Sequence, residues 1–85
     1  MDLYAAYLGG PLDDGRMGEG HEVVLVVAAD REDAAARAVA KWRGAPPGHV
    51  DALERIVRVD GFDVSLAPAT GTGEDDDLVE METFN

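Results

Sequence analysis

The chain of 85 residues contains no cysteine. Disulfide bonds, thiolate zinc sites and cysteine nucleophiles are therefore excluded. Serine occurs once, at Ser65, inside a stretch that reads as a β-hairpin, so no serine nucleophile is expected. Long hydrophobic runs are also missing, since the longest, residues 23–29, is too short to span a membrane. The first residues lack the basic region of a secretory signal, which predicts a cytoplasmic location.

Basic residues are missing from the last third of the chain. Residues 1–58 hold all seven Lys/Arg against ten Asp/Glu, whereas residues 59–85 hold eight acids and no base. Most of the formal net charge of −11 therefore lies toward the C-terminal end. Such a surface repels nucleic acid and anionic membranes and attracts cationic partners. We therefore expect a basic protein surface as partner, with no direct binding to nucleic acid or membrane.

The N-terminal half predicts two strands joined by a loop. Residues 3–8 read as a first strand, which the following Gly-Gly-Pro should end. Residues 11–20 are rich in glycine, proline and acids, which predicts a mobile loop. The continuous apolar stretch at residues 23–27 is typical of a strand buried on both faces. We therefore expect this second strand to lie centrally in the sheet.

Residues 31–43 carry the clearest helix signal. Asp30 can cap the first turn, and Asp33 occupies the capping-box position. Gly44, which two prolines follow closely, should end the helix. The apolar side of the helix is mostly alanine and should therefore lie close to the sheet. Trp42, its one large residue, should be buried in the core. The residues of that side are Ala35, Ala38, Val39 and Trp42.

Asp60-Gly61 predicts a tight hairpin turn, because a type I′ turn needs positive φ at both central residues. The turn joins strands at residues 53–59 and 62–66. A two-residue loop also sets Arg58 opposite Asp63, a cross-strand pair of opposite charge. Register and chemistry therefore agree on a hairpin.

The order of these elements predicts an α+β fold, in which a β-β-α-β-β antiparallel sheet carries one helix on one face. A chain of this length suits one such two-layer domain, which we place at residues 1–67. Residues 68–85 form an acidic C-terminal extension that either stays disordered or adds a fifth strand. The alternation of apolar and acidic residues at positions 79–83 favours the strand.

Both histidines lie beside carboxylates at the start of predicted strands. If these strand starts meet at one edge of the sheet, the side chains could form a divalent-metal site or an acid–base pair. The spacing matches no specific metal signature. In the alternative interpretation the histidines have only a structural role and hold loops in place by bonding to carboxylates and backbone. We expect no bound cofactor. The candidate residues are Glu19, His21, His49 and Asp51.

Five short motifs follow one another along the chain: Tyr7-Leu8-Gly9-Gly10, Glu19-Gly20-His21-Glu22, Trp42-Arg43-Gly44, His49-Val50-Asp51 and Val59-Asp60-Gly61-Phe62. Over residues 3–67 their order resembles a bacterial family, domain of unknown function 1543. The family pattern has Asp, Phe and Tyr where this chain has Glu22, Arg43 and Phe62, so a role for those side chains is not carried over. The resemblance implies a compact α+β unit and no particular reaction. Because some members look like two units in tandem, it also implies a homodimer of single units.

Two classes of function remain open. The first is a small non-catalytic module whose acids occupy a basic, nucleic-acid-binding surface of another protein, as DNA-mimicking inhibitors of CRISPR or restriction systems do. The second is a small homodimeric domain with a His/carboxylate metal or acid–base site. The charge excess and the lack of an activated nucleophile favour the first and disfavour an enzyme, although an acidic run can also serve solubility alone. The acids expected to bind are Glu74, Asp75, Asp76, Asp77, Glu80 and Glu82.

Overall fold

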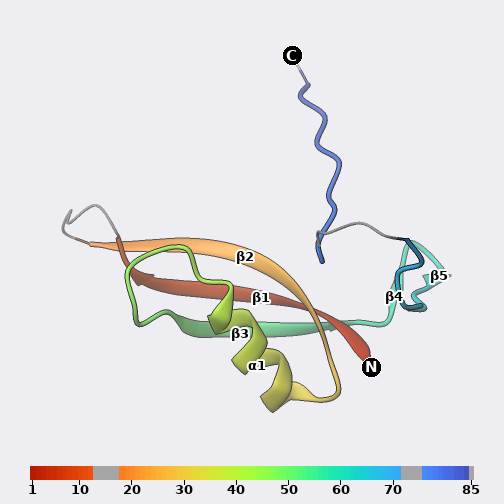
Figure 1. The fold of residues 1–85 in the computed structure, drawn as a ribbon, viewed down its shortest axis with the longest axis horizontal. Coiled ribbons are helices and arrows are strands. Elements are labelled where there is room, and N and C mark those ends of the chain that lie inside the picture. Colours follow the sequence, from red (N-terminus) through yellow and green to blue (C-terminus); the bar gives the residue numbers. More distant parts are fainter. Residues whose placement is uncertain (13–17, 72–75, 85) are drawn as a thin grey trace.

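The computed structural model describes residues 1–12, 18–71 and 76–84, and its main body is a three-stranded antiparallel sheet with one helix across one face (Figure 1). The predicted α+β fold is therefore confirmed. The sheet has the strand order β2-β1-β3, and β4 and β5 pair in a separate two-stranded ladder. The elements are β1 (Asp2–Pro11), β2 (Glu19–Ala28), α1 (Arg31–Ala40), β3 (His49–Ile56), β4 (Arg58–Val59) and β5 (Phe62–Asp63).

The strand with the longest apolar run lies at an edge of the sheet. β1 is the central strand, with β2 antiparallel on one side and β3 antiparallel on the other. The prediction that residues 23–27 lie centrally is therefore wrong. Val26 is buried on the helix side, but the alternate side chains Val23, Leu25 and Val27 stay 39–59% exposed on the opposite face. The run is thus apolar on both faces without being buried on both.

The sequence predicts that the first strand stops at the glycines, but β1 continues to Pro11. Gly9 pairs with His21 on β2 and with His49 on β3. The strand ends at a proline, whose missing N–H is tolerated at a strand terminus. The loop between β1 and β2 is correspondingly shorter than expected, and residues 13–17 of it lie outside the described residues.

Helix α1 begins where the sequence predicts and ends at Ala40, earlier than expected. The Asp30 carboxylate accepts a hydrogen bond from the Asp33 N–H at 2.8 Å, and the Asp33 carboxylate accepts one from the Ala29 N–H at 3.1 Å. The first bond satisfies an amide that the first turn of the helix leaves unpaired, and the second fixes the residue before the N-cap. No helix in the described part of the chain is long and apolar enough to cross a membrane.

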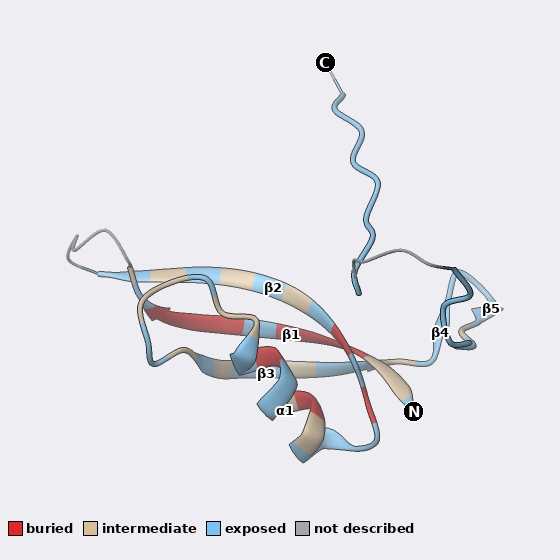
Figure 2. Cartoon of the chain, viewed as in Figure 1, coloured by how far each residue is buried: buried red, intermediate tan, exposed pale blue. Residues whose placement is uncertain are grey.

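The core between helix and sheet is built mainly from alanine. Figure 2 shows the buried residues gathered on β1, on the end of β2 and on the inner side of α1. Ala34 and Ala38 are the buried residues of α1, whereas Val39, expected on the inner side, is exposed. Such short side chains let the helix lie close to the sheet. The eight buried hydrophobic residues of the described chain are Tyr4, Ala5, Ala6, Leu8, Val26, Ala28, Ala34 and Ala38.

Trp42 follows the helix and packs against this core, as predicted, although it is only partly buried. Its indole N–H donates a hydrogen bond to the Ala45 carbonyl at 2.9 Å. Glycines flank the ring: a Cβ at Gly48 would lie 2.5 Å from Trp42 Cγ, one at Gly10 would lie 2.9 Å from Cζ2, and one at Gly44 would overlap Cζ2. The absence of side chains at these positions is what allows the close contact with the ring.

The Asp60-Gly61 turn forms as predicted. Asp60 and Gly61 both have positive φ, at 53° and 83°. Arg58 Nε donates to Asp63 Oδ1 at 2.8 Å across the strands, so the predicted charge pair is confirmed.

The hairpin does not extend the main sheet, and its strand residues Val59 and Phe62 stay exposed. The predicted strand at residues 53–59 is instead divided, since residues 53–56 belong to β3 and β4 holds only Arg58–Val59. β5 covers only two residues of the predicted strand at 62–66.

In the C-terminal extension the described residues, 68–71 and 76–84, contain no strand, so the predicted fifth strand is not formed there. The segment of residues 76–84 leads away from the sheet (Figure 1). Its apolar side chains are 81–90% exposed, namely Leu78, Val79, Met81 and Phe84.

Candidate functional site

Three polar side chains meet above Gly9, on the face of the sheet that α1 leaves open. Strand pairing places His21 and His49 on either side of this glycine. Asp51 lies between them, with Oδ1 2.9 Å from His49 Nε2 and Oδ2 3.8 Å from His21 Nδ1. Three of the four candidate residues predicted from the sequence are thus brought together. We call His21, His49 and Asp51 the His/Asp cluster.

Gly9 provides the space that the His/Asp cluster occupies. A Cβ at this position would lie 3.0 Å from Asp51 Oδ2, 3.0 Å from His49 Nε2 and 3.2 Å from His21 Nδ1. Real side chains rarely tolerate contacts this short, so any larger residue would push the three polar groups apart. The glycine of the first motif is therefore part of the site.

A β-bulge in β3 explains how Asp51 reaches the histidines. Tyr7 pairs with Ala52 and Leu8 with Val50, which leaves Asp51 as an extra residue. Bulges re-aim side chains and recur beside functional sites. Sequence reasoning could not find this feature, because the bulge depends on the register between two strands far apart in the chain.

The His/Asp cluster is open to solvent, with side chains 47–66% exposed. Glu19, the fourth candidate, shares the face of His21 on β2, but among the described contacts of the cluster it makes no hydrogen bond or ion pair. Within residues 1–12, 18–71 and 76–84, no three His, Cys, Asp or Glu side chains are spaced to hold a metal ion. The carboxylate instead contacts His49 directly, an arrangement that can orient an imidazole for proton transfer.

Tyr7 and Glu54 add a second polar contact on the same face, which the sequence analysis missed. The Tyr7 hydroxyl donates to Glu54 Oε1 at 2.9 Å. This hydrogen bond and the negative charge of Glu54 raise the pKa of Tyr7 above its usual value. Tyr7 lies on the same face of β1 as Gly9, two residues before it, and its hydroxyl reaches toward Glu54, whose strand partner is Ala5. The contact depends on the β1–β3 register, which the sequence does not reveal.

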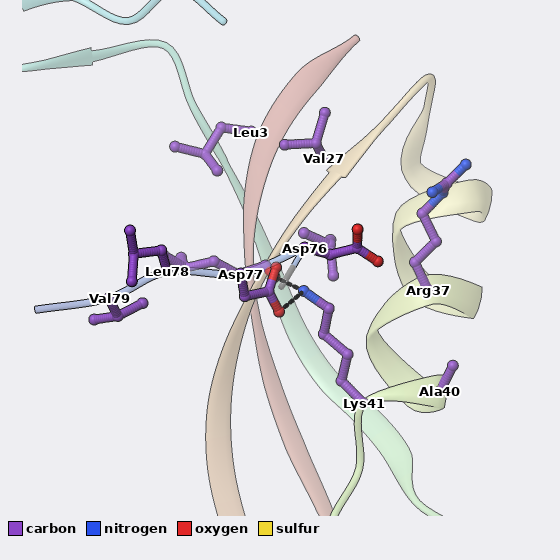
Figure 3. A pocket seen from close by; sticks show the side chains of 11 residues that line it. Leu3, Val27, Arg37, Ala40, Lys41, Asp76, Asp77, Leu78 and Val79 are labelled. Carbon is purple, nitrogen blue, oxygen red and sulfur yellow. Dashed lines mark hydrogen bonds and ion pairs between the residues drawn. The ribbon is translucent and has the colours of Figure 1, made fainter. Parts of the chain in front are cut away.

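A groove of about 660 Å³ lies between β2, the end of α1 and the start of residues 76–84 (Figure 3). Lys41 is at its centre: its Nζ donates to the Leu25 carbonyl at 2.7 Å and to Asp77 Oδ2 at 3.2 Å. Leu78 and Val79 line the same groove as Leu25. One lysine thus connects the outer edge of β2 with the acidic segment.

The acids predicted to bind a partner fall into three groups. Asp76 and Asp77 line the groove, while Glu80 and Glu82 lie further along the exposed segment. Glu74 and Asp75 lie outside the described residues. Of the four described acids, Asp77 alone has an ion-pair partner in the described chain.

The model of one protein family, Domain of Unknown Function (DUF1543), matches residues 16–66, which is more than half of the chain. The matched span takes in β2, α1, β3 and the hairpin, and with them His21, His49 and Asp51. No curated protein and no solved structure matches the chain.

Proposed function

Since the chain belongs to the DUF1543 family, whose function is unknown, its role has to be argued from its own surface, and we propose that it is a small non-catalytic binding module. Its acidic C-terminal segment would engage a basic surface of a protein partner. We place that surface on a protein that itself binds nucleic acid, which the module would occupy and inhibit in the manner of a DNA mimic.

The observation that carries the proposal is the exposure of the C-terminal acids. Asp76, Asp77, Glu80 and Glu82 are all solvent-exposed, in a stretch without a single base. Carboxylates in an extended chain repeat at about 6.6 Å for every second residue, which suits Arg and Lys side chains placed to contact phosphates. The exposed apolar residues between them add anchors that a run serving solubility alone does not need.

The experiment that tests the proposal is charge neutralisation. The variant Glu74→Gln/Asp75→Asn/Asp76→Asn/Asp77→Asn should bind the partner at least ~10-fold more slowly at low salt, because charge complementarity mainly sets the association rate. The thermal midpoint should hardly change, since isolated surface ion pairs contribute little to stability. The measurement is competition against labelled DNA or RNA bound to a partner purified by affinity capture, at two salt concentrations.

The variant Glu32→Gln, which removes one exposed acid from α1, serves as the control and should compete like the wild type. Added salt should weaken the wild type more than the neutralised protein, because the Debye length is only about 8 Å at physiological ionic strength. Equal potency of wild type and neutralised protein at low salt would leave the acids with a solubility role and remove the support for mimicry.

A second candidate function is favoured by the His/Asp cluster. Because Asp51 contacts His49 at 2.9 Å and both are open to solvent, the pair could act as an acid–base site. The wild type should then hydrolyse the activated ester p-nitrophenyl acetate faster than free imidazole at equal concentration. His49→Gln should remove this excess rate, Asp51→Asn should reduce it, and His21→Gln should change it least. A rate no higher than that of free imidazole would rule out this candidate.

A further inference from the structure

We propose that the outer edge of β2 binds an extended, positively charged segment of the partner as a fourth strand of the sheet. The inference rests on the proposed function for the charge of the partner, and it adds where and how that partner binds. β2 pairs with β1 along its whole length, and no described residue pairs with its other edge. Peptides commonly bind by adding a strand to such an edge.

Lys41 reveals which main-chain groups point outward. It donates from Nζ to the Leu25 carbonyl at 2.7 Å, so this carbonyl faces the free edge. The N–H and C=O of one residue in an antiparallel strand point to the same side, and the direction repeats every second residue. Val23, Leu25 and Val27 therefore present their main-chain groups to the edge, with Lys41 covering one carbonyl.

This edge lacks most of the protection that natural edge strands carry. Charged side chains, prolines and bulges usually prevent edge-to-edge pairing. Residues 23–28 contain no charged residue and no proline, and their pairing with β1 is regular. The row formed by Val23, Leu25 and Val27 also stays exposed on the open face. A strand added here would gain hydrogen bonds and cover apolar side chains together.

The negative charge beside the free edge of β2 indicates what kind of segment binds there. Asp76 and Asp77 line the groove that also includes Leu25 and Val27 (Figure 3). A basic side chain of an added strand can reach these acids and take the place of Lys41 on Asp77. A second copy of the chain would instead bring another formal charge of −11 to the same place. Charge complementarity therefore points to a cationic segment that alternates basic and apolar residues.

The test uses a ten-residue peptide of alternating valine and lysine as the probe, with the isotope-labelled full chain. Amide hydrogen exchange at Val23, Leu25 and Val27 should slow at least ~10-fold when the peptide binds, because added-strand hydrogen bonds protect outward-facing amides. A peptide of the same sequence with alternate backbone N-methyl groups keeps its charge but cannot complete the ladder. It should bind more weakly and give no such protection.

A matched pair of protein variants checks the location. Val23→Lys should weaken probe binding, since it places a like charge on the proposed edge. Val57→Lys should not, although Val57 is exposed to a similar degree, at 55% against 59% for Val23, because it lies outside β2. Equal effects of the two variants would overturn the assignment of the edge.

The outcomes separate this inference from the proposed function. In one outcome the two peptides bind equally, the three amides are not protected, and tail neutralisation abolishes the binding of both peptides. The acidic module then stands and strand addition is overturned. If the probe protects the three amides but tail neutralisation leaves partner competition unchanged, the edge site stands and the acidic-tail function fails. Protection that appears without probe and rises with protein concentration would assign the edge to a second copy and overturn the cationic segment.

Discussion

Replacing Gly44 with alanine should lower the free energy of unfolding by about 1–3 kcal/mol, the usual cost of overpacking. The new methyl group would overlap Trp42 Cζ2 and lie 2.6 Å from the Pro11 carbonyl oxygen. Neither neighbour can move freely. The indole N–H is bonded to the Ala45 carbonyl at 2.9 Å, and the Pro11 carbonyl accepts the Ala45 N–H at 3.0 Å. The substitution therefore strains the loop that fixes the only tryptophan.

Gly20→Ala is the matched control, because its methyl group also faces the indole. There the nearest atoms are Leu12 Cδ2 at 2.9 Å and Trp42 Cη2 at 3.6 Å, and a leucine methyl can rotate away. Guanidinium unfolding followed by Trp42 fluorescence and by circular dichroism measures both variants. In thermal unfolding the midpoint of Gly44→Ala should fall by ~4–8 °C for each kcal/mol of unfolding free energy that is lost. Midpoints that coincide for the two variants would show that the ring has room to adjust.

Replacing Leu8 with alanine should cost about 2–5 kcal/mol, the range for a truncated core leucine. Leu8 is 1% exposed and is the largest fully buried side chain described, in a core otherwise composed mostly of alanines. Alanines have no flexible atoms with which to fill the cavity, so little relaxation is available. The whole free energy of unfolding of a native protein is only about 5–15 kcal/mol, so this single change removes a large share of it.

Two further variants separate the cavity from the chemistry of the residue. Leu8→Met preserves most of the volume and should cost less than about 1.5 kcal/mol. Leu78→Ala removes the same atoms from an exposed position and should leave the unfolding midpoint unchanged. Denaturant unfolding gives all three values. If Leu8→Ala proved as mild as Leu78→Ala, the core between α1 and the sheet would not be the source of stability.

The features that the sequence predicted correctly depend on neighbouring residues. The start of α1 follows from Asp30 and Asp33, whose bonds span only a few positions. The hairpin turn follows from Asp60-Gly61, because positive φ at both residues favours few amino acids. Local chemistry of this kind is readable in a single chain. The length of the hairpin strands could not be predicted in this way, because it depends on packing against other elements, which the hairpin lacks.

The features that the sequence missed depend on distant pairing. An apolar run such as residues 23–27 predicts burial on both faces, but it cannot show whether a second layer is present to cover it. The His/Asp cluster needs both the β1 register that centres Gly9 and the bulge that displaces Asp51. The sequence could place these residues at strand starts, and only the structure shows them meeting over one glycine.

The central position of β1 has a consequence for how fast the chain can fold. β1 and β2 adjoin in the sequence, but the pairing of β1 with β3 joins residues as far apart as Leu3 and Ile56. Contacts between such distant residues slow folding, because a long segment must be ordered before they form. Helix formation takes only about a microsecond and does not limit the process. The folding time is therefore set by the search of β3 for the free side of β1.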